Sequence, residues 1–179
     1  MMKSASVGAI AVACAALLLA VSVRAADLPS KFDPARDAAR DVENALALAK
    51  AQGKRVIVDV GGEWCSWCHV LDRFIAANGD VRDVLAAQFV WLKVNYSKQN
   101  ENAAVLQHWP NVAGYPHLFV LDTAGTVVLS QDTEVLEDGR SYDKKRFLDF
   151  LARAARAQPS RAATAYGPFG LVGPPMRVL

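Results

Sequence analysis

The spacing of apolar residues changes several times between residues 33 and 157, and each change marks a predicted element. Asp33-Pro34 has the form of an N-cap followed by proline, after which apolar residues recur at helical spacing until Gly53. Residues 54–60 are β-branched and mostly apolar, which is typical of a buried parallel strand. The same criteria predict further helices over 65–78, 80–87, 101–108 and 143–157, strands over 89–96, 117–121 and 126–130, and a hairpin turn over 122–125. This order predicts one α/β domain with helices on both faces of its sheet.

The two ends of the chain differ in composition from this domain. Lys3, the apolar run 7–23 and the small residues near Ala26 have the pattern of a secretory signal peptide. The alternative is a membrane anchor formed by residues 7–23, but this run is rich in weakly hydrophobic Ala and short for a span of about 20 residues. We therefore expect a signal peptide over 1–26 and export to the periplasm. Residues 27–157 then form the domain, and residues 158–179, rich in Pro and Gly, form a flexible tail.

Charge and cysteine content narrow the function. The formal charge of the 179 residues is +2, and cleavage of the leader would remove Lys3 and Arg24 and leave a formal charge of zero. A neutral domain offers no electrostatic basis for nucleic-acid binding. The leader also contains Cys14, so Cys65 and Cys68 would remain as the one cysteine pair of the mature chain.

The cysteine pair lies where chemistry is expected. Cys65-Ser66-Trp67-Cys68 follows a predicted buried strand and begins a predicted helix. At a helix N-terminus the unpaired N–H groups and the positive end of the dipole favour a thiolate, so the pKa of Cys65 should be lowered. Cys68 lies one turn further on, close enough to form a disulfide. A purely structural bridge is the alternative, but closing so small a loop constrains the unfolded chain little. The position therefore favours a catalytic dithiol.

From about Ala35 to Ala157 the chain resembles the thioredoxin family, and within it the short exported thioredoxin-like proteins. Residues 58–68 are similar to the family's strand, loop and redox motif. Asp59 matches the family's buried aspartate, Lys93 matches the lysine paired with it, and Gly114-Tyr115-Pro116 matches the cis-proline segment. The resemblance implies a thioredoxin fold, with a central mixed β-sheet flanked by helices, and the activity of a thiol–disulfide oxidoreductase.

Several positions depart from the family pattern. Ser66-Trp67 replaces the Gly-Pro of ordinary thioredoxin, which leaves the redox potential and the direction of electron flow open. Gly61 stands where an aromatic residue is common, and His69 stands where a lysine is usual. No long helical insertion separates Tyr96 from Tyr115, unlike in the strong periplasmic oxidants. We therefore favour a reductase or a general exchange catalyst.

The four residues of the predicted centre have distinct roles. Cys65 attacks a disulfide of the partner and forms a mixed disulfide, and Cys68 then attacks the Cys65 sulfur and releases the partner. Asp59, surrounded by apolar neighbours, should have a raised pKa and could accept the Cys68 proton. A purely structural carboxylate neutralised by Lys93 is the alternative for Asp59.

The remaining candidate residues surround the sulfurs. Tyr115 and Pro116 should expose backbone groups with which an extended peptide could pair as an added strand. We expect Trp64 to pack over and shield the motif. Trp67 and His69 should lie on the exposed side of the helix, with Trp67 facing the partner and His69 either adjusting the pKa of a cysteine or merely solvated.

Three other interpretations remain open. Cys65, Cys68 and His69 also form the attachment motif of c-type haem, but Met176 is the one methionine outside the leader and the preceding strand is wrong for a small cytochrome. A zinc site lacks paired ligand spacing, so we expect no metal. A non-catalytic interaction module is the third. On the favoured interpretation the redox-active Cys65–Cys68 disulfide needs no further cofactor, and a monomer exchanges electrons with protein thiols and with a membrane or periplasmic redox partner.

Overall fold

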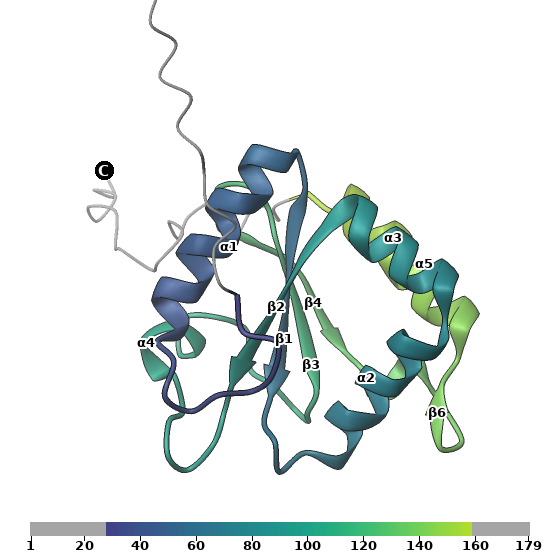
Figure 1. Ribbon diagram of the computed structural model, residues 1–179, viewed down its shortest axis with the longest axis horizontal. Helices are drawn as coiled ribbons and strands as arrows, with labels where there is room; N and C mark the ends of the chain where they lie inside the picture. Colours follow the sequence, from purple (N-terminus) through teal and green to yellow (C-terminus); the bar gives the residue numbers. More distant parts are fainter. Residues whose placement is uncertain (1–27, 159–179) are drawn as a thin grey trace, which may run out of the picture.

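The computed structural model describes residues 28–158, which form one α/β domain (Figure 1). The predicted signal peptide and nearly all of the predicted tail lie outside the described residues. The helices are α1 (Ala38–Gln52), α2 (Ser66–Ala77), α3 (Gly79–Gln88), α4 (Ala103–Leu106) and α5 (Lys144–Arg156), with a short 3-10 helix over Glu134–Leu136. The strands are β1 (Arg55–Gly61), β2 (Phe89–Asn95), β3 (His117–Leu121), β4 (Val127–Asp132), β5 (Glu137–Asp138) and β6 (Ser141–Tyr142).

The central sheet is mixed, with the strand order β2-β1-β3-β4. β1 pairs with β2 in parallel and with β3 antiparallel, and β3 pairs with β4 antiparallel. The central position of β1 explains its composition, because a strand covered on both faces reads as a continuous apolar run. The predicted thioredoxin fold, a mixed sheet flanked by helices, is confirmed. β5 and β6 form a separate two-stranded ribbon that the sequence did not predict.

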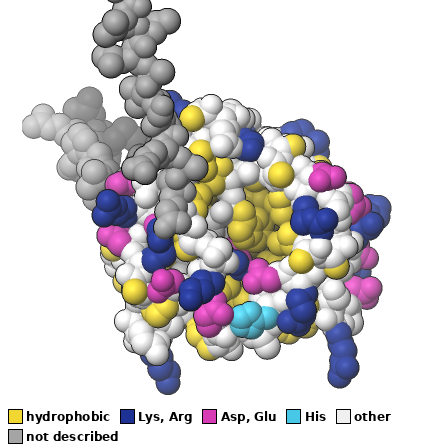
Figure 2. Space-filling view, in the orientation of Figure 1, with side chains coloured by type: hydrophobic (Ala, Val, Ile, Leu, Met, Phe, Trp, Pro, Cys, Tyr) yellow, Lys and Arg dark blue, Asp and Glu magenta, His cyan; other side chains and the backbone are white. Residues whose placement is uncertain are grey.

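Helices cover both faces of the sheet. Alternate residues of β1 point to opposite faces. Val56, Val58 and Val60 belong to the core under α1, whereas Ile57 belongs to the core formed with α2, α3 and α5. Figure 1 shows α1 on one side of the strands and the other three long helices on the opposite side. In Figure 2, apolar side chains gather over the β2 edge between α1 and α3, and charged side chains surround them.

Two predicted helices have wrong boundaries, and the start of each is determined by its cap residue. Helix α1 begins at Ala38, because the Asp37 carboxylate accepts the N–H groups of Ala39 and Arg40 as the N-cap. Asp33 instead accepts the N–H of Ala35 in a separate turn. The helix predicted over 101–108 is limited to Ala103–Leu106, and its later start is explained by Asn102, which has a left-handed backbone with φ of 48°.

The redox motif lies at the end of the sheet that carries the carboxyl ends of β1 and β2. The loop after β1 leads to α2, and Cys65 is its last residue. The peptide bond between Tyr115 and Pro116, just before β3, is cis, as the resemblance implied. Among residues 28–158, no helix has the length and apolar character needed to cross a membrane.

Candidate active site

The two cysteines form a disulfide at the N-terminus of α2, as the sequence predicted. The Cα atoms of Cys65 and Cys68 lie 5.3 Å apart. Cys65 is the N-cap residue, and its sulfur accepts the N–H of Cys68 at 3.1 Å. A tight turn, in which the Cys65 N–H donates to the Gly62 carbonyl at 2.9 Å, carries the chain from β1 into the helix. After reduction, the same N–H group and the helix dipole would stabilise a Cys65 thiolate.

Both sulfurs are almost covered. Cys65 is 3% exposed and Cys68 is fully buried. Phe32, from the segment before α1, packs against the pair, together with the partly buried Trp67 and Tyr115. A partner protein can therefore contact only the small exposed part of Cys65. Cys68 is out of reach of a partner and can react only with groups inside the protein.

Gly61 and Phe32 explain how Cys68 is accommodated. A Cβ atom at Gly61 would lie 2.4 Å from the Cys68 sulfur and 3.1 Å from Cζ of Phe32. Real side chains do not tolerate such approaches, so the last residue of β1 must be glycine here. Phe32 supplies an aromatic ring against the sulfur from a different part of the chain. Sequence reasoning missed Phe32, although the departure at Gly61 was the available signal.

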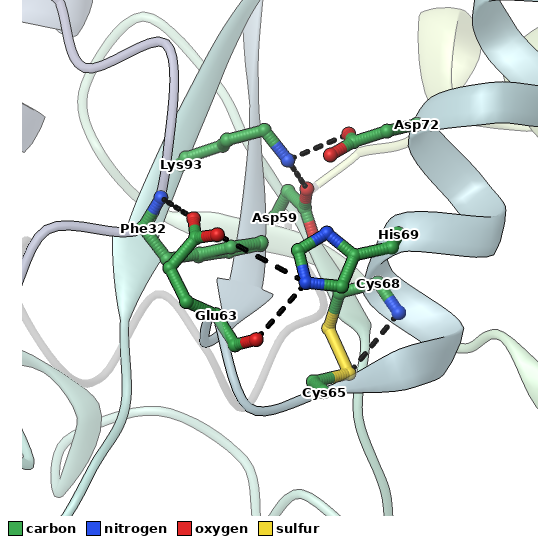
Figure 3. Close-up of polar contacts among 8 residues, drawn as sticks. All are labelled: Phe32, Asp59, Glu63, Cys65, Cys68, His69, Asp72 and Lys93. Atoms are coloured by element: carbon green, nitrogen blue, oxygen red, sulfur yellow. Dashed lines mark hydrogen bonds and ion pairs between the residues drawn. A yellow bond between two sulfur atoms is a disulfide. The ribbon is translucent and has the colours of Figure 1, made fainter.

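Asp59 and Lys93 meet as the resemblance implied. They face each other in the parallel register of β1 and β2, and Lys93 Nζ donates to Asp59 Oδ2 at 3.0 Å. Asp59 is fully buried and Lys93 is 7% exposed. Lys93 Nζ also lies 4.1 Å from the centroid of the Phe32 ring, a cation–π contact (Figure 3). Asp59 and Gly61 are two residues apart on β1, so they share the face that meets Cys68.

A second carboxylate completes this group of charges. Asp72 Oδ1, on α2, accepts from Lys93 Nζ at 2.7 Å. The sequence analysis did not single out Asp72. Its spacing from Cys68 was the available signal, because residues i and i+4 lie on one face of a helix.

Burial dominates the electrostatics of the pair. Desolvation raises the pKa of Asp59 to about 6, although attraction to Lys93 opposes the rise and the Asp72 charge adds to it. Burial alone would lower the pKa of Lys93, but its two carboxylate partners outweigh this and raise it. Asp59 Oδ1 has no hydrogen-bond partner within residues 28–158. A buried carboxylate with a free oxygen and a pKa near neutrality is suited to accept a proton.

His69 and Glu63 connect the redox loop to the segment before α1. The Glu63 carboxylate accepts the Phe32 N–H at 2.9 Å, and the Glu63 carbonyl lies 3.0 Å from His69 Nε2, as Figure 3 shows. The His69 side chain is 39% exposed. Its ring is therefore held by the loop that precedes the cysteines, on the partly exposed side of α2.

The two tryptophans of the motif differ from their predicted environments. Trp64 is 59% exposed, so it shields little of the motif, but its indole N–H donates to the Tyr96 carbonyl at 2.8 Å. Trp67 was predicted to be exposed, and this was wrong in part. It is partly buried because its ring packs edge-on against Tyr142, with centroids 5.6 Å apart.

The cis-proline segment borders a small hollow beside the disulfide. The hollow has a volume of about 280 Å³, and its lining includes Trp67, Tyr115 and Thr133. Thr133 Oγ1 donates to the Pro116 carbonyl at 2.6 Å and so fixes the segment. In the described part of the chain, neither the N–H nor the C=O of Tyr115 has a hydrogen-bond partner. The Tyr115 ring stacks on Tyr96 at 5.0 Å, and burial raises the pKa of its hydroxyl to about 12, so the phenol stays neutral.

Metal ligands do not converge in the described residues. Within 28–158, no group of three or more His, Cys, Asp or Glu side chains is placed to hold a metal ion.

Comparisons with known proteins agree with this geometry. The family model Thioredoxin_7, described as thioredoxin-like, matches residues 37–123. The thiol:disulfide interchange protein DsbD of Colwellia psychrerythraea is 29% identical over 94 residues, which cover 51% of this chain and 15% of that protein. DsbD of Haemophilus ducreyi is 32% identical over 79 residues, which cover 44% of this chain and 13% of that protein. The chain therefore corresponds to a small part of these curated relatives.

A solved structure covers more of the domain. The crystal structure of a disulphide isomerase from Xylella fastidiosa Temecula1 aligns with 72% of this chain and 98% of its own, at 26% identity and a TM-score of 0.56.

Proposed function

We propose that the chain is an exported thiol–disulfide oxidoreductase of the thioredoxin-like kind, which reduces or exchanges disulfides in partner proteins; the match of the thioredoxin-like family model to residues 37–123 and the similarity to the DsbD proteins support this. One observation carries the proposal. The Cys65–Cys68 disulfide caps α2 next to an unpaired Tyr115 backbone, and the face of β1 that meets Cys68 carries the buried Asp59. A structural bridge would need neither feature.

The exchange proceeds in two balanced steps from the reduced enzyme. The Cys65 thiolate attacks one sulfur of the partner's disulfide, the partner's other sulfur leaves as a thiolate, and a mixed disulfide forms. Cys68 then gives its proton to Asp59, and its thiolate attacks the Cys65 sulfur. The partner leaves with its second sulfur as a thiolate, which water protonates. Two electrons have passed to the partner, and the Cys65–Cys68 disulfide has formed.

The surface beside Cys65 suits an extended polypeptide. The free N–H and C=O of Tyr115 can pair with a partner strand, which places the partner's disulfide over Cys65. Pro116 cannot donate a hydrogen bond, and its carbonyl is already bonded to Thr133. Trp67, which lines the hollow, and the exposed Trp64, whose ring packs edge-on against Tyr115, offer apolar contact to the partner.

The dithiol carries both electrons, so the proposed reaction uses no other cofactor. Regeneration requires a second partner that reduces the Cys65–Cys68 disulfide, and we assign this role to a periplasmic or membrane-bound redox protein. The signal-peptide pattern of residues 1–26 supports export. The name of the DsbD relatives, thiol:disulfide interchange protein, supports a relay between protein thiols.

Trapping experiments test the mechanism. With a protein disulfide as substrate, Cys65→Ser should reduce the rate to that of free dithiol, whereas Cys68→Ser should accumulate mixed disulfides, because only Cys68 resolves them. Ser66→Ala, which changes an exposed residue between them, is the matched control and should retain turnover. Trapping by Cys65→Ser alone would reverse the assigned roles.

The wild-type protein separates the other interpretations. A rate no higher than that of free dithiol would favour an interaction module. A Soret absorption band with covalently attached haem would establish the cytochrome instead. Equilibration with glutathione buffers would give the reduction potential and hence the direction of electron flow.

A further inference from the structure

The ammonium group of Lys93 lies between two carboxylates from different elements. Asp59 Oδ2, on β1, is 3.0 Å from Nζ, and Asp72 Oδ1, on α2, is 2.7 Å from it. The exposure of the three side chains rises steadily along this line, from 0% for Asp59 through 7% for Lys93 to 41% for Asp72. The buried carboxylate is thus connected to the surface by one lysine and one further carboxylate.

The fold places Asp72 there for a local reason. Asp72 follows Cys68 by four residues on α2, so both lie on the face of the helix that meets β1 and β2. The Phe32 ring, itself buried, lies against Lys93 Nζ and closes another side of the ammonium (Figure 3). Of the two carboxylates that Lys93 binds, Asp72 is the one that water reaches.

We propose that Asp72 is a positioning residue for the release of the partner: it shares the Lys93 ammonium with Asp59 and links Asp59 to solvent, which keeps Asp59 able to take the Cys68 proton. The inference rests on the proposed exchange reaction and adds a residue to its second step. Asp72 acts through Lys93, and no part of its role requires contact with the substrate.

The physical reason is competition for one cation. If Lys93 bound Asp59 alone, the full attraction would stabilise the Asp59 carboxylate and make it a weaker base. Asp72 draws part of the hydrogen bonding of Lys93 to itself, and its own negative charge disfavours ionisation of Asp59. Both effects keep the Asp59 proton affinity high while the site stays paired.

The same line of groups can return the proton to water. After resolution Asp59 holds the proton that Cys68 has lost. Lys93 can pass one N–H proton to Asp72 and take the Asp59 proton in its place, which leaves Lys93 unchanged. Asp72 then releases the proton at the surface. The Asp59 carboxylate is thereby restored for the next turnover.

Asp72→Asn tests the proposal, because it removes the charge and keeps the shape. Two quantities are measured against pH: the titration of Asp59 by carboxyl carbon NMR, and the rate of mixed-disulfide resolution by stopped flow. We expect both midpoints to move to lower pH by about one unit, because a single charge partner moves a carboxyl by roughly this amount. The resolution rate at pH 8 should fall several-fold, and the first attack by Cys65 should not change.

Two further variants control for structure. Asp83→Asn alters an exposed carboxylate on α3 and should leave both midpoints where they are. Asp72→Glu keeps the charge and should restore the wild-type midpoint. An unchanged Asp59 titration in Asp72→Asn would overturn the proposal, and so would a rate loss with no shift of the midpoint, since a merely structural role predicts that result. The Asp59 titration needs no exchange activity, so failure of the proposed function would leave this test intact.

Discussion

Replacing Asp59 by asparagine should make the protein more stable at neutral and alkaline pH. Asp59 is fully buried, and one of its carboxylate oxygens has no hydrogen-bond partner among the described residues. Asparagine has the same shape and carries no charge that must be desolvated. Lys93 keeps Asp72 as its ionic partner in the variant, so no unpaired cation is left behind.

The size of the effect follows from the pKa of Asp59. Burial raises it from 3.8 to about 6, and this difference corresponds to about 3 kcal/mol. The folded protein binds the proton more tightly than the unfolded chain, so its free energy of unfolding decreases as pH rises from about 4 to about 6. Above that range the wild-type protein has lost about 3 kcal/mol that Asp59→Asn cannot lose.

Urea unfolding of the oxidised protein at several pH values between 4 and 8 measures this difference. The gap between Asp59→Asn and wild type should widen as pH rises and then level off above pH 7. Asp83→Asn, at an exposed position on α3, should follow the wild-type curve. If Asp59→Asn and wild type change in parallel over the whole range, the carboxyl does not titrate as described. Loss of stability at pH 8 would show that the ionised Asp59 is a structural partner of Lys93.

Two further substitutions test the packing and the capping. Gly61→Ala should cost roughly 1–3 kcal/mol in urea unfolding, because its Cβ would lie 2.4 Å from the Cys68 sulfur; an unchanged midpoint would mean that Cys68 is free to move. Asp37→Ala should cost about 1 kcal/mol by removing the N-cap of α1, and Asp33→Ala, which affects only a neighbouring turn, should cost less. Equal losses for both aspartates would contradict the assignment of the cap.

Features that depend on residues close together in the sequence were predictable. The apolar run of β1 and the cysteine at the start of α2 are local patterns, and the structure contains both. The N-cap of α1 could not be predicted in this way, because Asp33 and Asp37 are both residue types that cap helices. Which of them caps α1 depends on where the chain enters the helix. Asn102 is a similar case. Its side chain accepts the Ala38 N–H and donates to the Asn95 carbonyl, and no local sequence pattern predicts these two hydrogen bonds.

Long-range packing explains the remaining errors. Trp67 was expected on the exposed side of the helix, facing the partner. The β5–β6 ribbon brings Tyr142 against its ring, and strands of two residues are too short to produce a recognisable alternation of apolar and polar residues. The role of Phe32 was not predicted either, because it too depends on long-range packing. It precedes α1, and its contact with Cys68 depends on the return of β1 beneath it.

Local sequence patterns and long-range packing contribute differently to the surroundings of the two sulfurs. The hydrogen bonds around Cys65 are local, since they come from the turn at Gly62 and the first N–H groups of α2, although Phe32 and Tyr115 pack against the pair from other parts of the chain. The environment of Cys68 is tertiary, since Phe32, Gly61 and the Asp59–Lys93 pair come from three separate segments. Changes in the dipeptide between the cysteines should therefore act mainly on the attack and on the potential. Changes at Phe32 and Lys93 should act mainly on resolution, even though both residues lie far from the motif in the sequence.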